Sequence, residues 1–159
     1  MSEHAEKVRA AGCFTCTQNS ASARPVREEI LLTEHWRLAH AFGTPMPGWL
    51  VLLPLRHLTD VGELTAAESA ELGSLLAAGS RAVRAVTGCA KTYVAMFAEK
   101  DGFAHTHFHL IPRAPDLSPD LLGPAVFDLL TGPPEQWVTG RTADQVSGLI
   151  RDEIARSAE

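Results

Sequence analysis

Basic clusters and long apolar runs are both missing from this sequence, and each absence excludes a class of partner. The 159 residues include 14 lysines and arginines against 19 aspartates and glutamates, a formal net charge of −5 at pH 7. Without a basic stretch to follow a phosphate backbone, we expect no nucleic acid polymer as a partner. Without ~18 consecutive apolar residues no segment could span a membrane, and we expect no membrane partner.

Cysteine is also scarce, and its use narrows the chemistry. The cysteines are Cys13, Cys16 and Cys89, and an odd number argues against a disulfide framework. The first residues, MSEHAEKVRAAG, contain no apolar run after their charges, so we expect no signal peptide and a cytoplasmic location. In a reducing compartment the Cys13/Cys16 spacing indicates a metal-binding pair or a redox pair. We expect Cys89 to be a small buried apolar residue.

Short apolar runs predict five strands. The continuous run WLVLLP (49–54) is typical of a central, buried strand. The other expected strands are at 27–32, 36–42, 92–99 and 104–112, the last of them ended by Pro112.

Two capped segments predict helices. Thr65 and Glu68 have the spacing of a capping box before a helical repeat that ends at Gly88. Thr142 and Gln145 predict a second capping box at the start of a C-terminal helix. The resulting order β-β-β-α-β-β-α predicts an α+β fold with an antiparallel sheet, in one domain over residues 1–159.

The stretch HTHFHLIPR (105–113) contains three of the seven histidines at every second position. Alternate side chains of a strand share a face, so His105, His107 and His109 are expected about 6.6 Å apart on one side. That side would line a cleft, unless it is merely a histidine-rich outer face. Imidazoles can ligate a metal, attack an electrophile or donate hydrogen bonds to an anion. Same-face residues of a strand diverge, so we expect the three to divide these roles.

These residues resemble the histidine triad family. His-Thr-His-Phe-His-Leu-Ile (105–111) is similar to the signature His-φ-His-φ-His-φ-φ, in which φ is apolar, with Thr106 at the first φ. PGWLVLLPLRHLTDVGEL (47–64) resembles the segment before the long helix of that family, and many members also have a Cys-x-x-Cys pair. The resemblance covers a core of about 13–113 and leaves a C-terminal extension, 114–159. It implies a five-stranded antiparallel sheet with a packed central helix, a homodimer, and binding of purine nucleotides.

The resemblance also implies an activity, namely hydrolysis or transfer at the α-phosphorus of a purine nucleotide. The substrate would be a dinucleoside polyphosphate or a nucleoside phosphoramidate. By similarity, His107 attacks phosphorus to give a nucleotidyl-histidine, and His109 binds phosphate oxygens. Trp49 could stack on a base or lie in the core, and Arg113 could approach phosphate or remain solvated.

In zinc-containing members of the family, the positions that match Cys13, Cys16, His57 and His105 bind the metal. The resemblance therefore implies a closed, structural zinc site made of these four residues. His57 has an alternative role, because members without zinc also have this histidine, where it could end a strand or contact phosphate.

Two features depart from the family pattern. Many members carry a Gly-Gln-Ser stretch before the triad, where this chain has Lys100, Asp101 and Gly102. The acidic residue that usually holds the ribose falls near Ala41. These differences favour an alternative, a weakly active or non-catalytic nucleotide-binding sensor on the same fold. A zinc-stabilised interaction protein is a third possibility, but it would give the triad no task.

Overall fold

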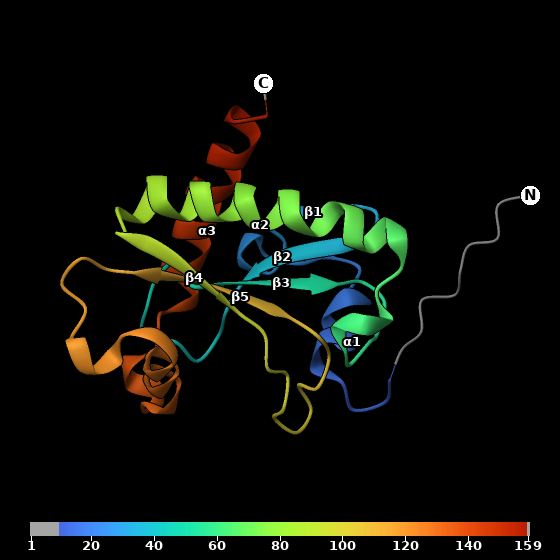
Figure 1. Ribbon diagram of the computed structural model, residues 1–159, viewed down its shortest axis with the longest axis horizontal. Coiled ribbons are helices and arrows are strands. Elements are labelled where there is room, and N and C mark those ends of the chain that lie inside the picture. Colours follow the sequence, from blue (N-terminus) through green and yellow to red (C-terminus); the bar gives the residue numbers. More distant parts are fainter. Residues whose placement is uncertain (1–9, 159) are drawn as a thin grey trace, which may run out of the picture.

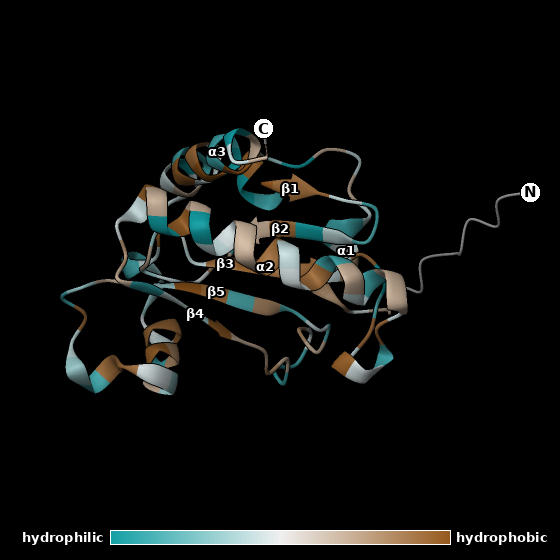
Figure 2. Cartoon of the chain, turned by 45° about the horizontal axis from the view of Figure 1, so that its top comes forward, coloured by the Kyte–Doolittle hydropathy of each residue, from teal (hydrophilic) through white to brown (hydrophobic). Residues whose placement is uncertain are grey.

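The computed structural model describes residues 10–158, and its centre is a five-stranded antiparallel sheet in the order β1-β2-β3-β5-β4 (Figure 1). The strands are β1 (Leu31–Leu32), β2 (Trp36–His40), β3 (Leu50–Pro54), β4 (Lys91–Ala95) and β5 (Phe108–Arg113). The expected α+β fold is therefore confirmed. As predicted, β3 is a central strand, hydrophobic along its length (Figure 2).

Several expected strands are shorter in the structure. The segment 27–32 forms the 3-10 turn η1 (Val26–Glu28) and then only two paired residues in β1. β4 ends at Ala95, and β5 starts only at Phe108, because the chain between them makes a turn in which Ala98 has a positive φ of 53°. Pro112 does not end β5, since Arg113 still pairs with Lys91 and accepts a hydrogen bond from the Ala90 N–H.

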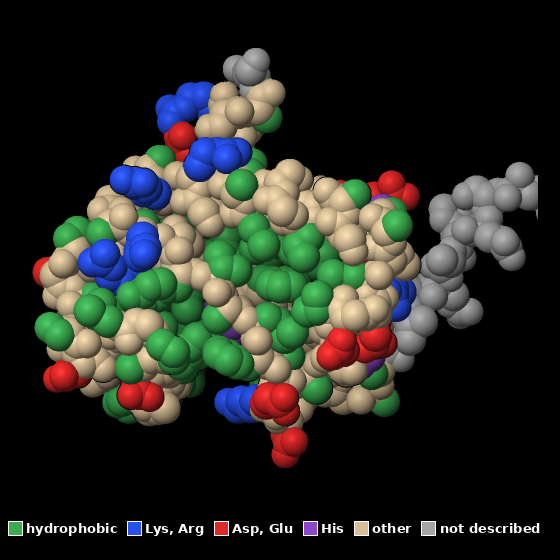
Figure 3. Space-filling view, viewed as in Figure 1, with side chains coloured by type: hydrophobic (Ala, Val, Ile, Leu, Met, Phe, Trp, Pro, Cys, Tyr) green, Lys and Arg blue, Asp and Glu red, His purple; other side chains and the backbone are tan. Residues whose placement is uncertain are grey.

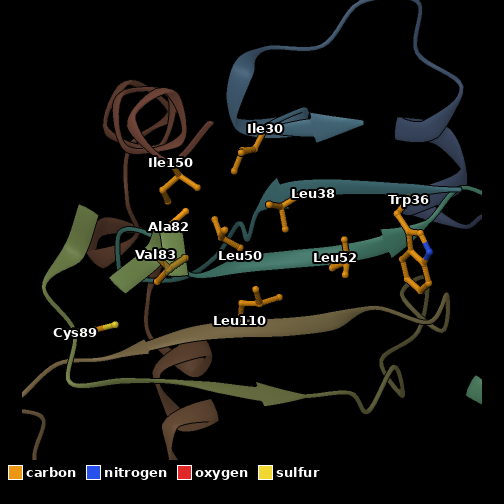
Figure 4. Close-up of a cluster of buried hydrophobic side chains, with 10 residues drawn as sticks. All are labelled: Ile30, Trp36, Leu38, Leu50, Leu52, Ala82, Val83, Cys89, Leu110 and Ile150. Carbon is orange, nitrogen blue, oxygen red and sulfur yellow. The ribbon is translucent and has the colours of Figure 1, made fainter. Parts of the chain in front are cut away.

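One face of the sheet is covered by the long helix α2 (Ala66–Thr87). Its capping box is present as expected: Thr65 accepts from the Glu68 N–H, and the Glu68 carboxylate accepts from the Thr65 N–H. Gly88 ends the helix with a φ of 68°, in the left-handed region that suits glycine. Between helix and sheet lies the main hydrophobic core (Figure 4), which contains Ile30, Trp36, Leu38, Leu50, Leu52, Ala82, Val83, Cys89, Leu110 and Ile150.

The C-terminal helix α3 (Gly140–Arg156) packs against α2 and η1. Its N-cap is Thr139, whose hydroxyl accepts from the Thr142 N–H. The predicted capping box at Thr142 and Gln145 is therefore wrong, because the helix begins one turn earlier. No helix in the described part of the chain is long and apolar enough to cross a membrane.

Among residues 10–158, the other face of the sheet is covered only at its two ends. The short helix α1 (Phe14–Asn19) lies at one end, and the 3-10 segments η3 (Pro119–Leu121), η4 (Gly123–Thr131) and η5 (Pro134–Gln136) lie toward the other (Figure 1). Val126 of η4 joins Ala41, Trp49 and Ile111 in a second, smaller core. The middle of this face therefore stays open between the two coverings.

Candidate metal centre and active site

Four predicted metal ligands meet where α1 packs against the sheet. Cys13 is the N-cap residue of α1 and Cys16 lies in its first turn, while His57 follows β3 and His105 precedes β5. One sulfur or nitrogen atom from each of the four lies within 4.8 Å of all the others. Cys13, Cys16 and His105 are buried, so the group is closed to solvent on most sides.

The spacing of these atoms fits tetrahedral zinc. With Zn–S of ~2.3 Å and Zn–N of ~2.05 Å, a tetrahedron has N···N edges of about 3.3 Å and S···N edges of about 3.6 Å. His57 Nδ1 and His105 Nδ1 are 3.2 Å apart. The Cys16 Sγ lies 3.4 Å from His57 Nδ1 and 3.6 Å from His105 Nδ1, and the Cys13 Sγ lies 3.6 Å from His105 Nδ1. The residues therefore fit the metal in both kind and geometry.

His105 is held in the form that a metal ligand needs. Its Nε2–H donates to the Pro54 carbonyl at 2.9 Å, which leaves Nδ1 without a proton and directed at the cysteines. Burial is the main cause that lowers the pKa of His105 to about 4, so the ring is neutral at physiological pH. The side chain is fully buried, and its Nδ1 faces Cys13, Cys16 and His57, which together with His105 are called the metal group below.

His107 is oriented by the backbone of the neighbouring metal ligand. Its Nδ1 lies 2.8 Å from the His105 carbonyl oxygen, and since a carbonyl can only accept, Nδ1 carries the proton. In the neutral ring Nε2 is then unprotonated and has a free lone pair. The ring lines a pocket on the open sheet face, so this lone pair belongs to a side chain that a ligand can reach.

His109 has the opposite tautomer. The Trp49 indole N–H donates to His109 Nδ1 at 3.0 Å, so in the neutral ring the proton is on Nε2. Burial, and secondarily the charge of His107, lower the pKa of His109 to about 3. The two rings meet edge to face with centroids 4.8 Å apart. One pocket thus holds a histidine with a free lone pair beside a histidine with a free N–H donor.

The structure corrects one expectation about this region and bears on the alternatives for Trp49 and Arg113. Only His109 lies within β5, so the three histidines do not share one strand face: His105 joins the metal group, while His107 and His109 line the pocket. Trp49 is fully buried and is not part of the pocket lining, so a substrate base cannot stack on it. Arg113, at the far end of β5, does not line the pocket either.

The pocket has a volume of about 480 Å³ and is mainly apolar. Its charged lining residues are Glu28, Arg37, Glu99 and Lys100. Arg37 is 2 % exposed and donates to Asn19 Oδ1 at 2.8 Å, with the Glu28 carboxylate 3.4 Å away. Sequence reasoning missed Arg37, although an arginine in the mainly apolar strand WRLAH is a visible signal of a buried polar site.

Three phenylalanines form an aromatic cluster at the pocket, and they too were missed. Phe14, Phe42 and Phe103 come from α1, the loop after β2 and the loop before the triad, and their ring centroids are 5.0 to 5.4 Å apart. Lys100, which replaces a residue of the expected Gly-Gln-Ser stretch, holds its ammonium 5.5 Å from the centre of the Phe103 ring. Each ring lies far from the others in sequence, so no local pattern marks the cluster.

Comparisons with protein-family models and with curated proteins find no match. Solved structures do match. A zinc-bound histidine triad family protein from Mycobacterium smegmatis has a TM-score of 0.64 at 19 % identity, over 92 % of this chain and 97 % of that one. A hypothetical histidine triad nucleotide-binding protein from Sulfolobus tokodaii gives 0.69 at 16 % identity, over 91 % and 93 %. A histidine triad protein from Bradyrhizobium japonicum gives 0.65 at 20 % identity, over 79 % and 89 %. With its sheet, its central helix and its triad loop in this arrangement, the chain has the fold of the histidine triad proteins.

Proposed function

We propose that this protein is a zinc-containing histidine triad enzyme that cleaves a purine nucleotide at its α-phosphorus. The substrate is a dinucleoside polyphosphate or a nucleoside phosphoramidate. One observation carries the proposal: His107 and His109 line the same pocket in complementary tautomers, one with a free lone pair and one with a free N–H. This is the pair of functions that nucleophilic displacement at phosphorus requires.

The reaction has two steps. The His107 Nε2 lone pair attacks phosphorus, a N–P bond forms, and the bond to the leaving group breaks with its electron pair going to the leaving oxygen or nitrogen. The His109 Nε2–H donates to a phosphate oxygen, whose negative charge grows in the transition state. Water then attacks the same phosphorus and releases a proton, which balances the proton that the leaving group takes up from solvent. The N–P bond breaks with its electron pair returning to His107 Nε2, and a nucleoside monophosphate leaves.

Zinc completes the site without taking part in these steps. When bound by Cys13, Cys16, His57 and His105, it would join α1 to the ends of β3 and the triad loop as a structural cross-link. His105 connects the metal to the nucleophile, because its side chain belongs to the metal group and its carbonyl accepts from His107. A zinc-loaded protein therefore keeps His107 in the reactive tautomer.

The test is a covalent label. A nucleotide substrate with ³²P at the α-position should leave an acid-labile label on the peptide that contains His107. His107→Ala should abolish the label and lower turnover by several orders of magnitude, with zinc content and fold unchanged. His109→Ala should weaken labelling without moving it to another peptide. Near-normal turnover by His107→Ala on every substrate that the parent cleaves contradicts the covalent mechanism.

A nucleotide sensor is the second candidate. It is favoured by Lys100, Asp101 and Gly102, which stand where many family members have Gly-Gln-Ser. The same substrate panel, including AMP-phosphoramidate and dinucleoside polyphosphates, separates the two. Tight binding without turnover of any compound supports the sensor and contradicts the enzyme.

A homodimer is part of the proposal on the resemblance to the family. The edge strand β4 supports it, because Val94 is 47 % exposed there and hydrophobic side chains gather on the face beside α2 and β4 (Figure 3). Sedimentation at micromolar concentration should give a species of twice the 17.1 kDa chain mass. A single 17.1 kDa species contradicts the dimer. The cytoplasmic location stays a prediction.

A further inference from the structure

The catalytic pocket has two aromatic walls that come from different parts of the chain. The first wall is the cluster of Phe14, Phe42 and Phe103 described above. The second wall comes from the C-terminal extension, which the catalytic motifs do not include, and consists of Phe127, Leu130 and Trp137. The Phe127 ring lies 5.0 Å from the His109 ring, centroid to centroid, so this second wall begins directly beside the histidine pair.

The two walls differ in polarity. Of the other lining residues, Thr15 follows Phe14 in α1, Arg37 donates to Asn19 at the end of the same helix with the Glu28 carboxylate 3.4 Å away, and the Lys100 ammonium lies 5.5 Å from the Phe103 centroid. The first wall therefore has charged groups and a hydroxyl near its aromatic rings. Two pocket-lining side chains of the extension have a hydrogen-bond donor, and each of them donates to a carbonyl of the extension itself. Thr131 donates to the Asp128 carbonyl at 2.7 Å and Trp137 to the Gly132 carbonyl at 3.1 Å. The second wall therefore offers a ligand apolar contact and no free donor.

The second wall is built into the fold and does not depend on a loose loop. Phe127 packs edge to face on Trp49, with centroids 5.6 Å apart, and Trp49 is the donor that orients His109. Trp137 lies over Gly43, where an added Cβ would be 3.7 Å from the indole. The Val138 N–H donates to the Thr44 carbonyl at 2.9 Å and fastens this segment to the loop after β2. Such a wall is preorganised, which favours binding.

We propose that the extension wall is a leaving-group site, which selects nucleotide substrates whose leaving group is large, apolar and aromatic. This inference rests on the proposed function, because it takes the phosphorus to lie against His107 and His109. The α-phosphorus carries the nucleoside on one side and the leaving group on the other. The first wall, with its stacking rings and polar groups, suits a purine. The extension wall has no donor with which to read a base, and it suits an apolar group.

A matched pair of substrates tests the site. AMP phosphoramidates of ethylamine and of 2-(1-naphthyl)ethylamine have leaving amines of similar basicity and differ in apolar size. The parent protein should cleave the naphthylethyl compound with a kcat/KM at least about tenfold higher, because apolar contact of this size discriminates at that level.

One variant and one control assign the effect to the wall. Leu130 is half-buried in the pocket lining, so Leu130→Ala should fold, and it should lower the naphthylethyl-to-ethyl ratio of kcat/KM about tenfold. Leu122 is a leucine of the same extension that is 44 % exposed and does not line the pocket. Leu122→Ala should keep both kcat/KM values.

The outcomes separate this site from the proposed enzyme. If the parent cleaves both compounds equally well, the enzyme stands and the leaving-group site is overturned. If the parent cleaves neither compound, phosphoramidates are not its substrates, the full substrate panel decides the enzyme, and calorimetry decides the site. Binding of the naphthylethyl compound about tenfold tighter than the ethyl compound, lost in Leu130→Ala, then supports the site, and equal affinities overturn it.

Discussion

At the scale of single residues, the proposed chemistry depends on which nitrogen of each histidine carries a proton. His107 donates to the carbonyl of His105, and His109 accepts from Trp49, so neighbouring rings take opposite tautomers. The spacing of the triad made the histidines visible in the sequence. Their partners were not visible, because a backbone carbonyl has no sequence signature and Trp49 is 60 positions away from His109.

Trp49→Phe tests this orientation. Phenylalanine fills most of the space, but the N–H that donates to His109 Nδ1 is lost, so the ring is free to exchange tautomers. We expect kcat to fall about tenfold, the value of one buried hydrogen bond. ¹⁵N NMR should show the two His109 nitrogens moving toward an averaged tautomer. Trp36→Phe is the control, because that indole donates to the Glu68 carbonyl in the core. Unchanged His109 signals in Trp49→Phe would contradict the assignment.

At the scale of elements, α2 was predictable because its signals are local. A capping box at Thr65 and Glu68 and a glycine at position 88 mark its two ends within the sequence itself. The end of β4 and the start of β5 were not predictable, since the apolar pattern at 92–99 continues past Ala95 and the pattern at 104–112 begins before Phe108. The turn at Ala98 and the metal group at His105 remove those residues from the sheet.

The start of α3 gives a direct test of the corrected cap. Thr139→Ala removes the hydroxyl that accepts from the Thr142 N–H and should lower the free energy of unfolding by about 1 kcal/mol. Thr142→Ala keeps that acceptor and should change the free energy by less than half as much. Urea denaturation of the two single variants measures both values. A larger loss in Thr142→Ala would restore the cap predicted from sequence.

At the scale of the whole molecule, buried neutral histidines make stability depend on pH. Burial lowers the pKa of His109 to about 3 and that of His40 below its usual value. In the unfolded chain His109 takes up a proton near pH 6.5, while its folded ring stays neutral until the pH approaches 3, so its contribution to stability is lost as pH falls below 6.5. The lowered pKa of His40 acts in the same direction. His35, whose pKa is raised by its hydrogen bond to Glu71, has the opposite effect above pH 6.5 and adds no slope below it.

The change of the free energy of unfolding with pH can be assigned to one residue. Between pH 6 and pH 5, His109 should lower the free energy of unfolding by about 1.4 kcal/mol per pH unit, because its folded pKa lies well below this range. His109→Asn keeps an acceptor for the Trp49 N–H. It should reduce the slope of the free energy of unfolding against pH by about 1.4 kcal/mol per pH unit, which corresponds to the uptake of one proton. Urea denaturation at several pH values, with zinc present throughout, measures it. An unchanged slope in His109→Asn would show that this ring is protonated in the folded state.

The metal group ties three distant segments together, and its loss should therefore reach both stability and chemistry. Elemental analysis should find about one zinc per chain, and removal with a chelator should lower the free energy of unfolding by several kcal/mol, because binding of a structural metal is folding free energy. Cys13→Ser should lose the metal, while Cys89→Ala, a change at a buried cysteine outside the group, should keep it. Since the carbonyl of His105 holds the proton of His107, metal-free protein should also lose most of its covalent labelling. Full zinc occupancy in Cys13→Ser would exclude this residue as a ligand, and full labelling in the metal-free protein would separate the nucleophile from the metal.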